Sequence, residues 1–459
     1  MHHRSRTSTV FLVFAFLAAC RNKATERSTT SSNRSIEASA SASSASSALT
    51  PTKLTADAPA PAFLSAGGST YRIDAGKLDK MDGVSIVDAE LSPDGILYVL
   101  TQEGVTTYRG GSLQPLPSFG ARSIAFGPKG ELWAVGYTSV ARFDGTAWKE
   151  THIPEDCVLC NRIGVDSKGT VYVGGSDKVD ALTGEKWSTI DPTTLFGAVK
   201  TDDVGLEVTP SIYGFDRVGD QLFIAANVGM LSMDDKHTKL ELPVANQLSR
   251  YLGGKPGVTA NGELAGYSAS SYFVTNGKGQ TATHGLDEVG LAATRISAFA
   301  VDGQGRRYVG SDGGFVIQSK DGKPLLALPP GTLPGVVDDV FVFAKGPELP
   351  AKAPDVVKGS LKGRLMVNGK PMKNADVEMC DSPSPVLTGG ATPCSGKPAV
   401  ARAKTDEAGV FHMTDVLLGA YEIAFKDDKG WSTTLGGYSY GGHLTQGQEL
   451  DVGDISINN

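Results

Sequence analysis

Five cysteines carry the clearest spacing signal for chemistry in this 459-residue chain. Cys20 stands alone, and the other four form two close pairs, Cys157 with Cys160 and Cys380 with Cys394. Export to an oxidising compartment would favour disulfides in both pairs. A Cys380–Cys394 bond would close a loop of about 15 residues, which in the chain-entropy model contributes about 3 kcal/mol.

The C-x-x-C motif formed by Cys157 and Cys160 also invites redox, zinc and haem interpretations. A redox thiolate needs a helix N-terminus or positive charge nearby, but Glu155 and Asp156 precede the motif. Zinc would need a second pair of ligands at a suitable spacing, and haem attachment would need a histidine where Asn161 stands. We therefore predict a small structural disulfide in a loop.

Serine and histidine patterns give no catalytic constellation. Residues 437–441 (GYSYG) satisfy G-x-S-x-G, but a nucleophile elbow needs a strand, a tight turn and a helix, and the residues that follow predict another strand. The histidines form no H-E-x-x-H or H-x-H cluster outside the leader, where they are His152, His237, His284, His412 and His443. We predict no catalytic residue, no metal site and no cofactor.

Charge is mildly acidic and scattered, with 43 basic against 50 acidic residues and a net charge of −7. The chain lacks the basic footprint of a nucleic-acid binder, so no nucleic-acid partner is expected. The acidic pairs do not have the alternating ligand spacing of a calcium loop. They are interpreted as solvated turns: Asp234-Asp235, Asp338-Asp339 and Asp427-Asp428.

The N-terminus is typical of an export signal. Arg4 and Arg6 precede Val10–Ala19, which carries no charge and is too short for a membrane span of about 20 residues. Leu17-Ala18-Ala19-Cys20 resembles the lipobox of bacterial lipoprotein signals. The resemblance implies a signal peptide over residues 1–19 and lipidation of Cys20. Arg-Asn rather than Asp after the cysteine implies an outer-membrane lipoprotein, for a Gram-negative source.

Residues 20–62 form a Ser/Ala/Thr-rich stretch with no aromatic residue between Arg21 and Ala62. Such a stretch cannot bury enough apolar surface to offset the entropy of ordering. We predict a disordered linker that joins the lipidated cysteine to the folded body.

A phrase recurs through the body: an apolar strand, a Gly-containing turn, and a strand with a central aromatic residue. Its copies include "SPDGILYVL", "GPKGELWAV" and "DGQGRRYVG". The first and last of the six turns lie 210 residues apart, an average spacing of 42, and the turn positions are Gly95, Gly130, Gly169, Asp220, Gly262 and Gly305. A period in the low forties built from short strands is typical of β-propeller blades.

The two ends of this region each supply part of one more repeat. Residues 336–346 match the first strand of the phrase, and residues 67–76 match its later part. Closing the ring with strands from both ends removes open edges, so we favour seven blades, with six as the alternative. The propeller is predicted over residues 63–345. Its repeats resemble those of two-component-regulator and virginiamycin B lyase-like propellers.

A Pro-rich linker (346–355) leads to a second β-domain, 356–459. Its "TDEAGVFHMTDVLLGAYEIAF" includes Thr405, Asp406, Gly409, Phe411 and Tyr421. This resembles the carboxypeptidase regulatory-like (transthyretin-like) domain, which implies a β-sandwich acting as an accessory or adhesive module without peptidase activity.

These features predict an all-β, lipid-anchored protein of the cell envelope, at the periplasmic face or the cell surface. Its expected role is binding or scaffolding without catalysis: propeller and sandwich would recognise an unknown protein, peptide or glycan, and the chain would be monomeric. One alternative is a lyase or hydrolase acting in the central channel of the propeller. Another is an extracytoplasmic sensor module.

Overall fold

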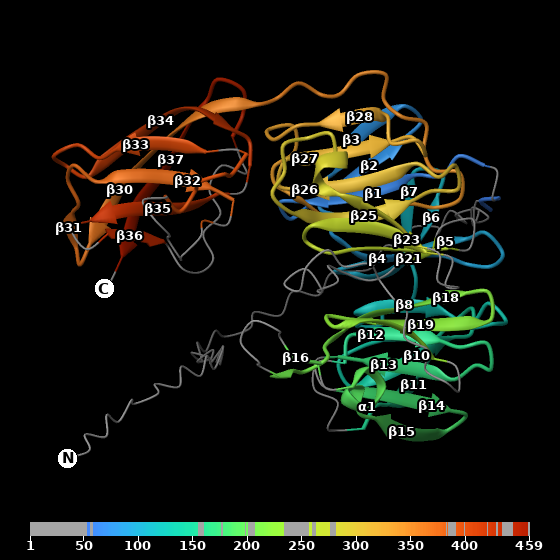
Figure 1. Ribbon diagram of the computed structural model, residues 1–459. Coiled ribbons are helices and arrows are strands. Elements are labelled where there is room, and N and C mark those ends of the chain that lie inside the picture. Colours follow the sequence, from blue (N-terminus) through green and yellow to red (C-terminus); the bar gives the residue numbers. More distant parts are fainter. Residues whose placement is uncertain are drawn as a thin grey trace, which may run out of the picture. The chain divides into compact units, whose positions relative to one another are not determined.

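The chain is described from a computed structural model (Figure 1). All the described residues belong to a compact unit that begins at Leu49. They are 53–55, 58–154, 160–175, 178–197, 199–200, 207–233, 257–258, 263–275, 281–381, 383, 392–398, 400–419, 421–427, 430–433 and 444–457. Predictions for Cys20, for Cys157, for the signal peptide and for the G-x-S-x-G stretch fall outside these residues.

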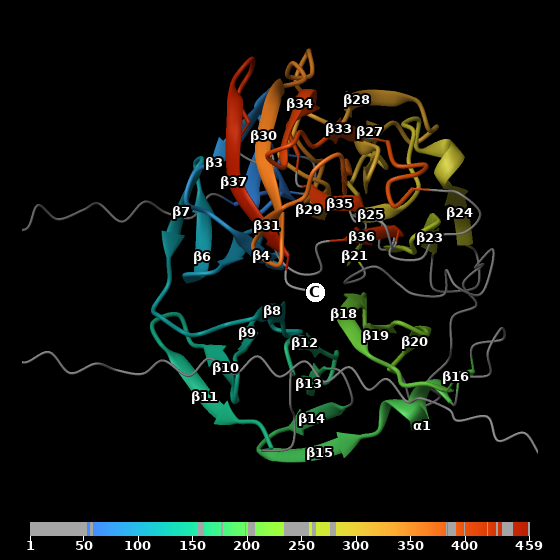
Figure 2. The ribbon, with the colours of Figure 1, turned by 90° about the vertical axis from the view of Figure 1, so that its left-hand side faces the viewer.

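Seven antiparallel sheets of three or four strands form the blades in the described part of the first domain, beside one two-stranded pair, and this confirms a seven-bladed β-propeller. Figure 2 shows β4, β8, β12 and β18 on the inner side and β7, β11 and β15 on the outer side of their sheets. From the inner strand outward, the first three sheets are β4 (Ile86–Leu91), β5 (Leu97–Thr101), β6 (Gly104–Arg109) and β7 (Ser112–Pro115); β8 (Ser123–Phe126), β9 (Leu132–Val135), β10 (Ser139–Phe143) and β11 (Trp148–His152); β12 (Arg162–Val165), β13 (Val171–Gly174), β14 (Val179–Thr183) and β15 (Lys186–Ile190).

The remaining four sheets continue around the ring. They are β18 (Ile212–Val218), β19 (Gln221–Ala226) and β20 (Gly229–Ser232); β21 (Gly257–Val258), β22 (Leu264–Tyr267), β23 (Ser271–Thr275) and β24 (Thr281–Gly285); β25 (Ile296–Val301), β26 (Arg307–Ser311), β27 (Gly314–Gln318) and β28 (Pro324–Leu328); β29 (Val337–Phe341), β1 (Ala62–Ala66), β2 (Ser69–Asp74) and β3 (Lys77–Met81). Outside the blades lie α1 (Pro192–Phe196), the short pair β16 (Val199–Lys200) and β17 (Glu207–Val208), and η2 (Leu286–Glu288).

The last of these sheets closes the ring with both ends of the domain, as the sequence predicts. β29 contributes the inner strand and pairs antiparallel with β1, so that Leu64 lies opposite Val340 and Ser65 opposite Asp339. The match to earlier repeats began only at residue 67, whereas β1 lies upstream of it. Phe63 and Leu64 are fully buried there, and their burial is what recruits this extra strand into the sheet.

Among the residues that the structure describes, Gly95 and Gly305 adopt the positive φ angles predicted for the recurring turns. Gly95 and Gly305 have φ of 84° and 74°, conformations that cost glycine little. The strands that follow are buried on both faces; Leu97, Val99 and Leu100 of β5 are all inaccessible to solvent. Neighbouring blades must therefore cover each sheet on both sides, which is the physical reason that the ring closes.

Polar groups tie neighbouring blades to one another. The Ile86 amide of β4 donates to Thr70 Oγ1 of β2 over 3.1 Å. Tyr267 Oη donates to the Ser297 carbonyl over 2.5 Å, and Ser297 Oγ donates in turn to the Val337 carbonyl over 2.7 Å. The last two bonds link three successive sheets, those that contain β22, β25 and β29.

The Pro-rich stretch after the propeller is held on the propeller surface. The Ala60 amide donates to the Gly346 carbonyl and the Gly76 amide to the Glu348 carbonyl, both over 3.2 Å. Leu349 and Ala353 pack against the core cluster that contains Tyr308 and Leu64. The region predicted as a linker is thus a docked segment over at least its first half.

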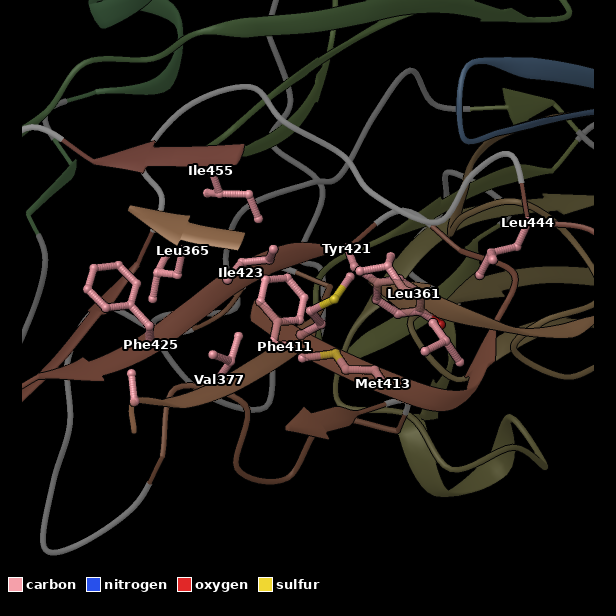
Figure 3. Close-up of a cluster of buried hydrophobic side chains, with 13 residues drawn as sticks. Leu361, Leu365, Val377, Phe411, Met413, Tyr421, Ile423, Phe425, Leu444 and Ile455 are labelled. Carbon is pink, nitrogen blue, oxygen red and sulfur yellow. The ribbon is translucent and has the colours of Figure 1, made fainter. Parts of the chain in front are cut away.

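The second domain has two four-stranded sheets that share one apolar core, which makes it a β-sandwich. Figure 3 shows side chains of both sheets gathered in this core, among them Leu361, Phe411, Met413, Val377 and Ile423. One sheet has β31 (Lys370–Pro371), β30 (Lys358–Val367), β34 (Val410–Leu417) and β37 (Glu449–Ile457), and the other has β33 (Ala401–Lys404), β32 (Asp376–Cys380), β35 (Glu422–Asp427) and β36 (Gly430–Thr433).

A disulfide joins Cys380 and Cys394, as predicted, with a Cα–Cα distance of 5.8 Å. Both residues are fully buried, and Cys380 is the last residue of β32. Replacing both by alanine should destabilise the sandwich by about 3 kcal/mol, because the open chain gains the entropy of an untied loop. Urea unfolding of the oxidised protein, the reduced protein and the variant would measure this. Equal midpoints for all three would contradict it.

Candidate functional site

The central channel of the propeller contains a cavity of about 740 Å³. All seven blades line it, through the inner strands β4, β8, β12, β18, β25 and β29 and through β22. Small residues allow this convergence. Gly164 of β12 is one of them, because a Cβ there would lie 2.3 Å from the Cβ of Phe215 in the next blade. We call the end of the channel where the inner strands begin the N end, and the other the C end.

Carboxylates dominate the charged groups of the cavity wall. Six of them and one guanidinium line it: Asp88, Glu90, Asp94, Asp216, Asp302 and Asp339, with Arg217. Phenylalanine and tyrosine side chains supply much of the remaining wall: Phe126, Phe215, Tyr267, Phe299, Phe341 and Phe343. The cavity is therefore acidic with apolar walls, a combination that strengthens the field of its charges.

Asp88 is fixed by the backbone and by the next blade. Its Oδ1 accepts from the Ala89 amide over 3.0 Å, while Oδ2 accepts from Ser123 Oγ over 2.8 Å and from the Ile124 amide over 3.1 Å. These bonds join β4 to β8 near the N end. Asp88 thus has a structural role, and it also places a fixed negative charge beside the lumen.

Asp339 lies in the middle of β29, and its side chain is exposed to the cavity that it lines. The walls of the channel surround this cavity, so the carboxyl group is confined within the protein. The pKa of its carboxyl is raised to about 6, first by this burial and then by the charges of Asp338 and Asp88, while Arg162 acts in the opposite direction. Burial likewise raises the pKa of Asp338, which Arg295 opposes. The N end therefore holds carboxyl groups whose charged forms are disfavoured by their surroundings.

The C end is lined in part by the chain segment that precedes the first blade. The Leu54 amide donates to the Gly95 carbonyl over 2.7 Å. A Cβ at Gly95 would lie 2.3 Å from the Leu54 carbonyl oxygen, so only glycine admits the segment this closely. Leu54 and Thr55 both line the cavity. This end of the channel is consequently narrowed by the protein's own upstream segment.

The acidic pair Asp338-Asp339 was expected to be a solvated turn, and this interpretation is wrong. Both residues belong to β29, and Asp427 likewise belongs to β35 rather than to a turn. The sequence signal was available, because residues 336–346 had been matched to an inner strand. Placing that strand on the channel would have placed Asp339 at the lumen.

The other predicted residues that the structure describes do not line the cavity, whereas His237, His443 and the pair Asp234-Asp235 lie outside the described residues. Cys160 is disulfide-bonded and buried; its predicted partner, Cys157, lies outside the described residues. His284 Nδ1 contacts Glu288 Oε2 over 2.7 Å beside the outer strand β24, and His412 pairs with Glu449 on the sandwich. Within the described ranges, no histidine lines the cavity and no three metal-binding side chains converge.

Among the helices that the structure describes, none is long and apolar enough to span a bilayer. The expected anchor, Cys20, precedes the described ranges, so its lipidation stays a prediction.

Comparison with known proteins defines no family for the chain. No protein-family model matches it, and no curated protein matches it. Among solved structures, two extracellular domains from B. thetaiotaomicron, of a one-component and a hybrid two-component system, are similar at 15% and 12% identity, each with a TM-score of 0.40. They cover 58% and 84% of this chain, which spans only 35% and 55% of theirs.

A third similar structure is PorZ, a bacterial surface component of the type-IX secretion system of Porphyromonas gingivalis. Its identity is 14% and its TM-score 0.34, with 82% of this chain and 68% of that chain covered. Likenesses of this strength carry no argument about activity or partners. The site itself must therefore support any functional conclusion.

Proposed function

We propose that the chain is a lipid-anchored recognition protein of the cell envelope whose propeller binds its ligand in the central channel. The observation that carries this proposal is the cavity, to which all seven blades contribute. A concave, mostly preformed space with apolar walls and a few placed polar groups is the usual form of a ligand site. Cys20 supplies the membrane anchor, and the sandwich, as a transthyretin-like module, supplies a second contact surface.

Ligand capture tests the channel. The mature chain carrying Cys20→Ser, immobilised and incubated with envelope extract, should retain a component that the added change Asp339→Lys removes. Asp321→Lys is the matched control, because Asp321 is exposed in the turn between β27 and β28, where it does not line the cavity. A component bound equally by both variants, or no component at all, would refute binding in the channel.

Metabolic labelling tests the anchor. Cells expressing the full-length chain and fed an alkyne fatty acid should label it, and Cys20→Ser should abolish both the label and membrane association. The reason is that stable anchoring needs more than one acyl chain, and Cys20 is the predicted attachment point. A Cys20→Ser chain that stays labelled and membrane-bound would contradict the proposal.

A hydrolase or lyase acting in the cavity is the second candidate, and Asp339 favours it. A carboxyl group with a pKa of about 6 can both donate and accept a proton near neutral pH. Binding needs only shape and charge, so it remains the first proposal. A bound component that wild type converts and that Asp339→Asn binds without converting would favour the enzyme.

A further inference from the structure

The sandwich contacts the propeller at the N end of the channel, on the blade formed by β25–β28. Inner strand β25 begins at this end and outer strand β28 ends there, because successive strands of the blade are antiparallel. The Val357 amide donates to the carbonyl of Gly331, in the loop after β28, over 2.9 Å. Nη2 of Arg295, directly before β25, lies 2.8 Å from Oδ2 of Asp381, which follows β32 of the sandwich. One contact is therefore at the outer strand of the blade and the other beside its inner strand.

The outer contact is made by the main chain. Gly331 has φ of 89°, and a Cβ there would lie 2.8 Å from Val356 Cγ1 and 3.2 Å from Leu417 Cβ, so this close approach needs glycine. The Leu418 amide donates in turn to the Val357 carbonyl over 2.9 Å. These bonds tie residues 356–357 to the propeller on one side and to the end of β34 on the other. We call this contact the hinge.

The inner contact is an ion pair between side chains, beside the lumen. Burial raises the pKa of Asp338, which Arg295 lowers and Asp381 raises, so both partners lie close to the neighbour of lumen-lining Asp339. Burial and then Asp339 and Asp338 raise the pKa of Tyr267, another lining residue, and Arg295 opposes them. The Arg295–Asp381 pair, which we call the latch, is thus at the N end of the cavity.

We propose that the sandwich is a lid on the N end of the channel, which turns about the hinge at residues 356–357 and is held shut by the Arg295–Asp381 latch. A ligand enters when the latch opens. The N end is the route because Leu54 and Thr55 narrow the C end. This inference rests on the proposed function and adds the regulation of the same channel.

The latch is weak enough to open while both domains stay folded. The side chains of Arg295 and Asp381 are 40% and 30% exposed. Ion pairs with such exposure shift an equilibrium by up to about five-fold, and salt screens them. Asp381 itself is well placed on the sandwich, because the adjacent Cys380 is joined to Cys394 by the buried disulfide. Opening therefore needs one side-chain pair to separate.

The reactivity of a thiol inside the channel tests the lid. Ala125 of β8 lines the cavity, and Ala125→Cys in the mature Cys20→Ser chain places a thiol there. The probe is a neutral maleimide with a poly(ethylene glycol) tail; Cys160, Cys380 and Cys394 are disulfide-bonded and do not react with it. Asp381→Asn and Arg295→Met should each speed labelling about three-fold. The two changes together should add nothing, because each removes the same pair.

Matched variants and salt separate the latch from general loosening. Asp376→Asn removes an exposed ion pair within the sandwich, that of Asp376 with Lys404 at 3.2 Å, and should leave the labelling rate unchanged. A thiol at the exposed turn position, Asp321→Cys, should react equally fast with and without the latch. Raising sodium chloride from about 0.05 M to about 0.5 M should speed labelling at Ala125→Cys when the latch is intact, but not in Asp381→Asn.

Unchanged labelling in both latch variants, or an equal increase in Asp376→Asn, would overturn the lid. Hydrogen exchange adds a second check: residues 356–358 should stay protected in Asp381→Asn, and lost protection there would overturn the hinge. Labelling needs no ligand, so the two proposals fail separately. If labelling ignores the latch while Asp339→Lys still removes the extract component, the lid is wrong and binding in the channel stands. If labelling follows the latch but no component is captured, the lid stands and the proposed function is wrong.

Discussion

Replacing Asp302 by alanine should destabilise the propeller by about 3–5 kcal/mol, the usual cost of leaving a buried charge without its partner. The Asp302 side chain is fully buried and that of Arg306 is 11% exposed. Asp302 Oδ2 also accepts from Tyr308 Oη over 2.8 Å, and Oδ1 accepts from the Gln304 and Arg306 amides. All of these donors would lose an acceptor in the variant.

The same cluster holds the start of the docked segment after the propeller. Arg306 Nη2 donates to the Lys345 carbonyl over 3.0 Å. Gly346 has φ of 71°, and a Cβ there would lie 2.3 Å from Asp302 Oδ2. Asp302→Ala should therefore also release residues 345–349, which hydrogen exchange followed by mass spectrometry would detect as lost protection.

Urea unfolding of the mature Cys20→Ser chain measures the stability change. Asp302→Ala combined with Arg306→Met serves as the control, because removing both charges should restore part of the loss. A single variant that loses less than about 1 kcal/mol, or a double variant that is no more stable than the single one, would show that the ion pair does not hold this part of the ring.

The architecture could be predicted because each repeat encodes its own local structure. The turn at Gly95 and the apolar run after it determine a hairpin without reference to the rest of the chain. The composite blade was also predictable, since residues 336–346 and 67–76 each match a fragment of the phrase. The strand Ala62–Ala66 was not, because its alanines carry little strand signal and only burial in the assembled ring explains it.

The candidate site was harder to predict because its residues are distributed. Asp88, Asp216 and Asp339 lie on three different blades and come together only when the ring closes. Their spacing in the sequence does not indicate that these residues line one cavity. The raised pKa of Asp339 depends on burial and on the charges of Asp338 and Asp88. The sequence shows the adjacent pair Asp338-Asp339, but it does not show the burial or the neighbouring Asp88. The disulfide between Cys380 and Cys394 was predictable because short loop closure needs only local information.

Replacing Phe411 by alanine should unfold the sandwich while leaving the propeller folded. Phe411 is fully buried among the core side chains in Figure 3. Its ring lies over Gly363 of the neighbouring strand β30, where a Cβ would be 2.7 Å from Phe411 Cζ. Truncating a buried phenylalanine costs about 3–5 kcal/mol, a large part of the stability of a domain of about 100 residues.

Hydrogen exchange followed by mass spectrometry distinguishes the two domains in one experiment. Strands β30, β34 and β35 should lose protection in Phe411→Ala, while β9 and β13 should exchange as in wild type. Thr414→Ala is the matched control, since Thr414 lies on the same strand with its side chain exposed. The two domains have separate core clusters, so each should unfold by itself. Loss of protection in β9 and β13 together with the sandwich would instead make the chain one cooperative unit.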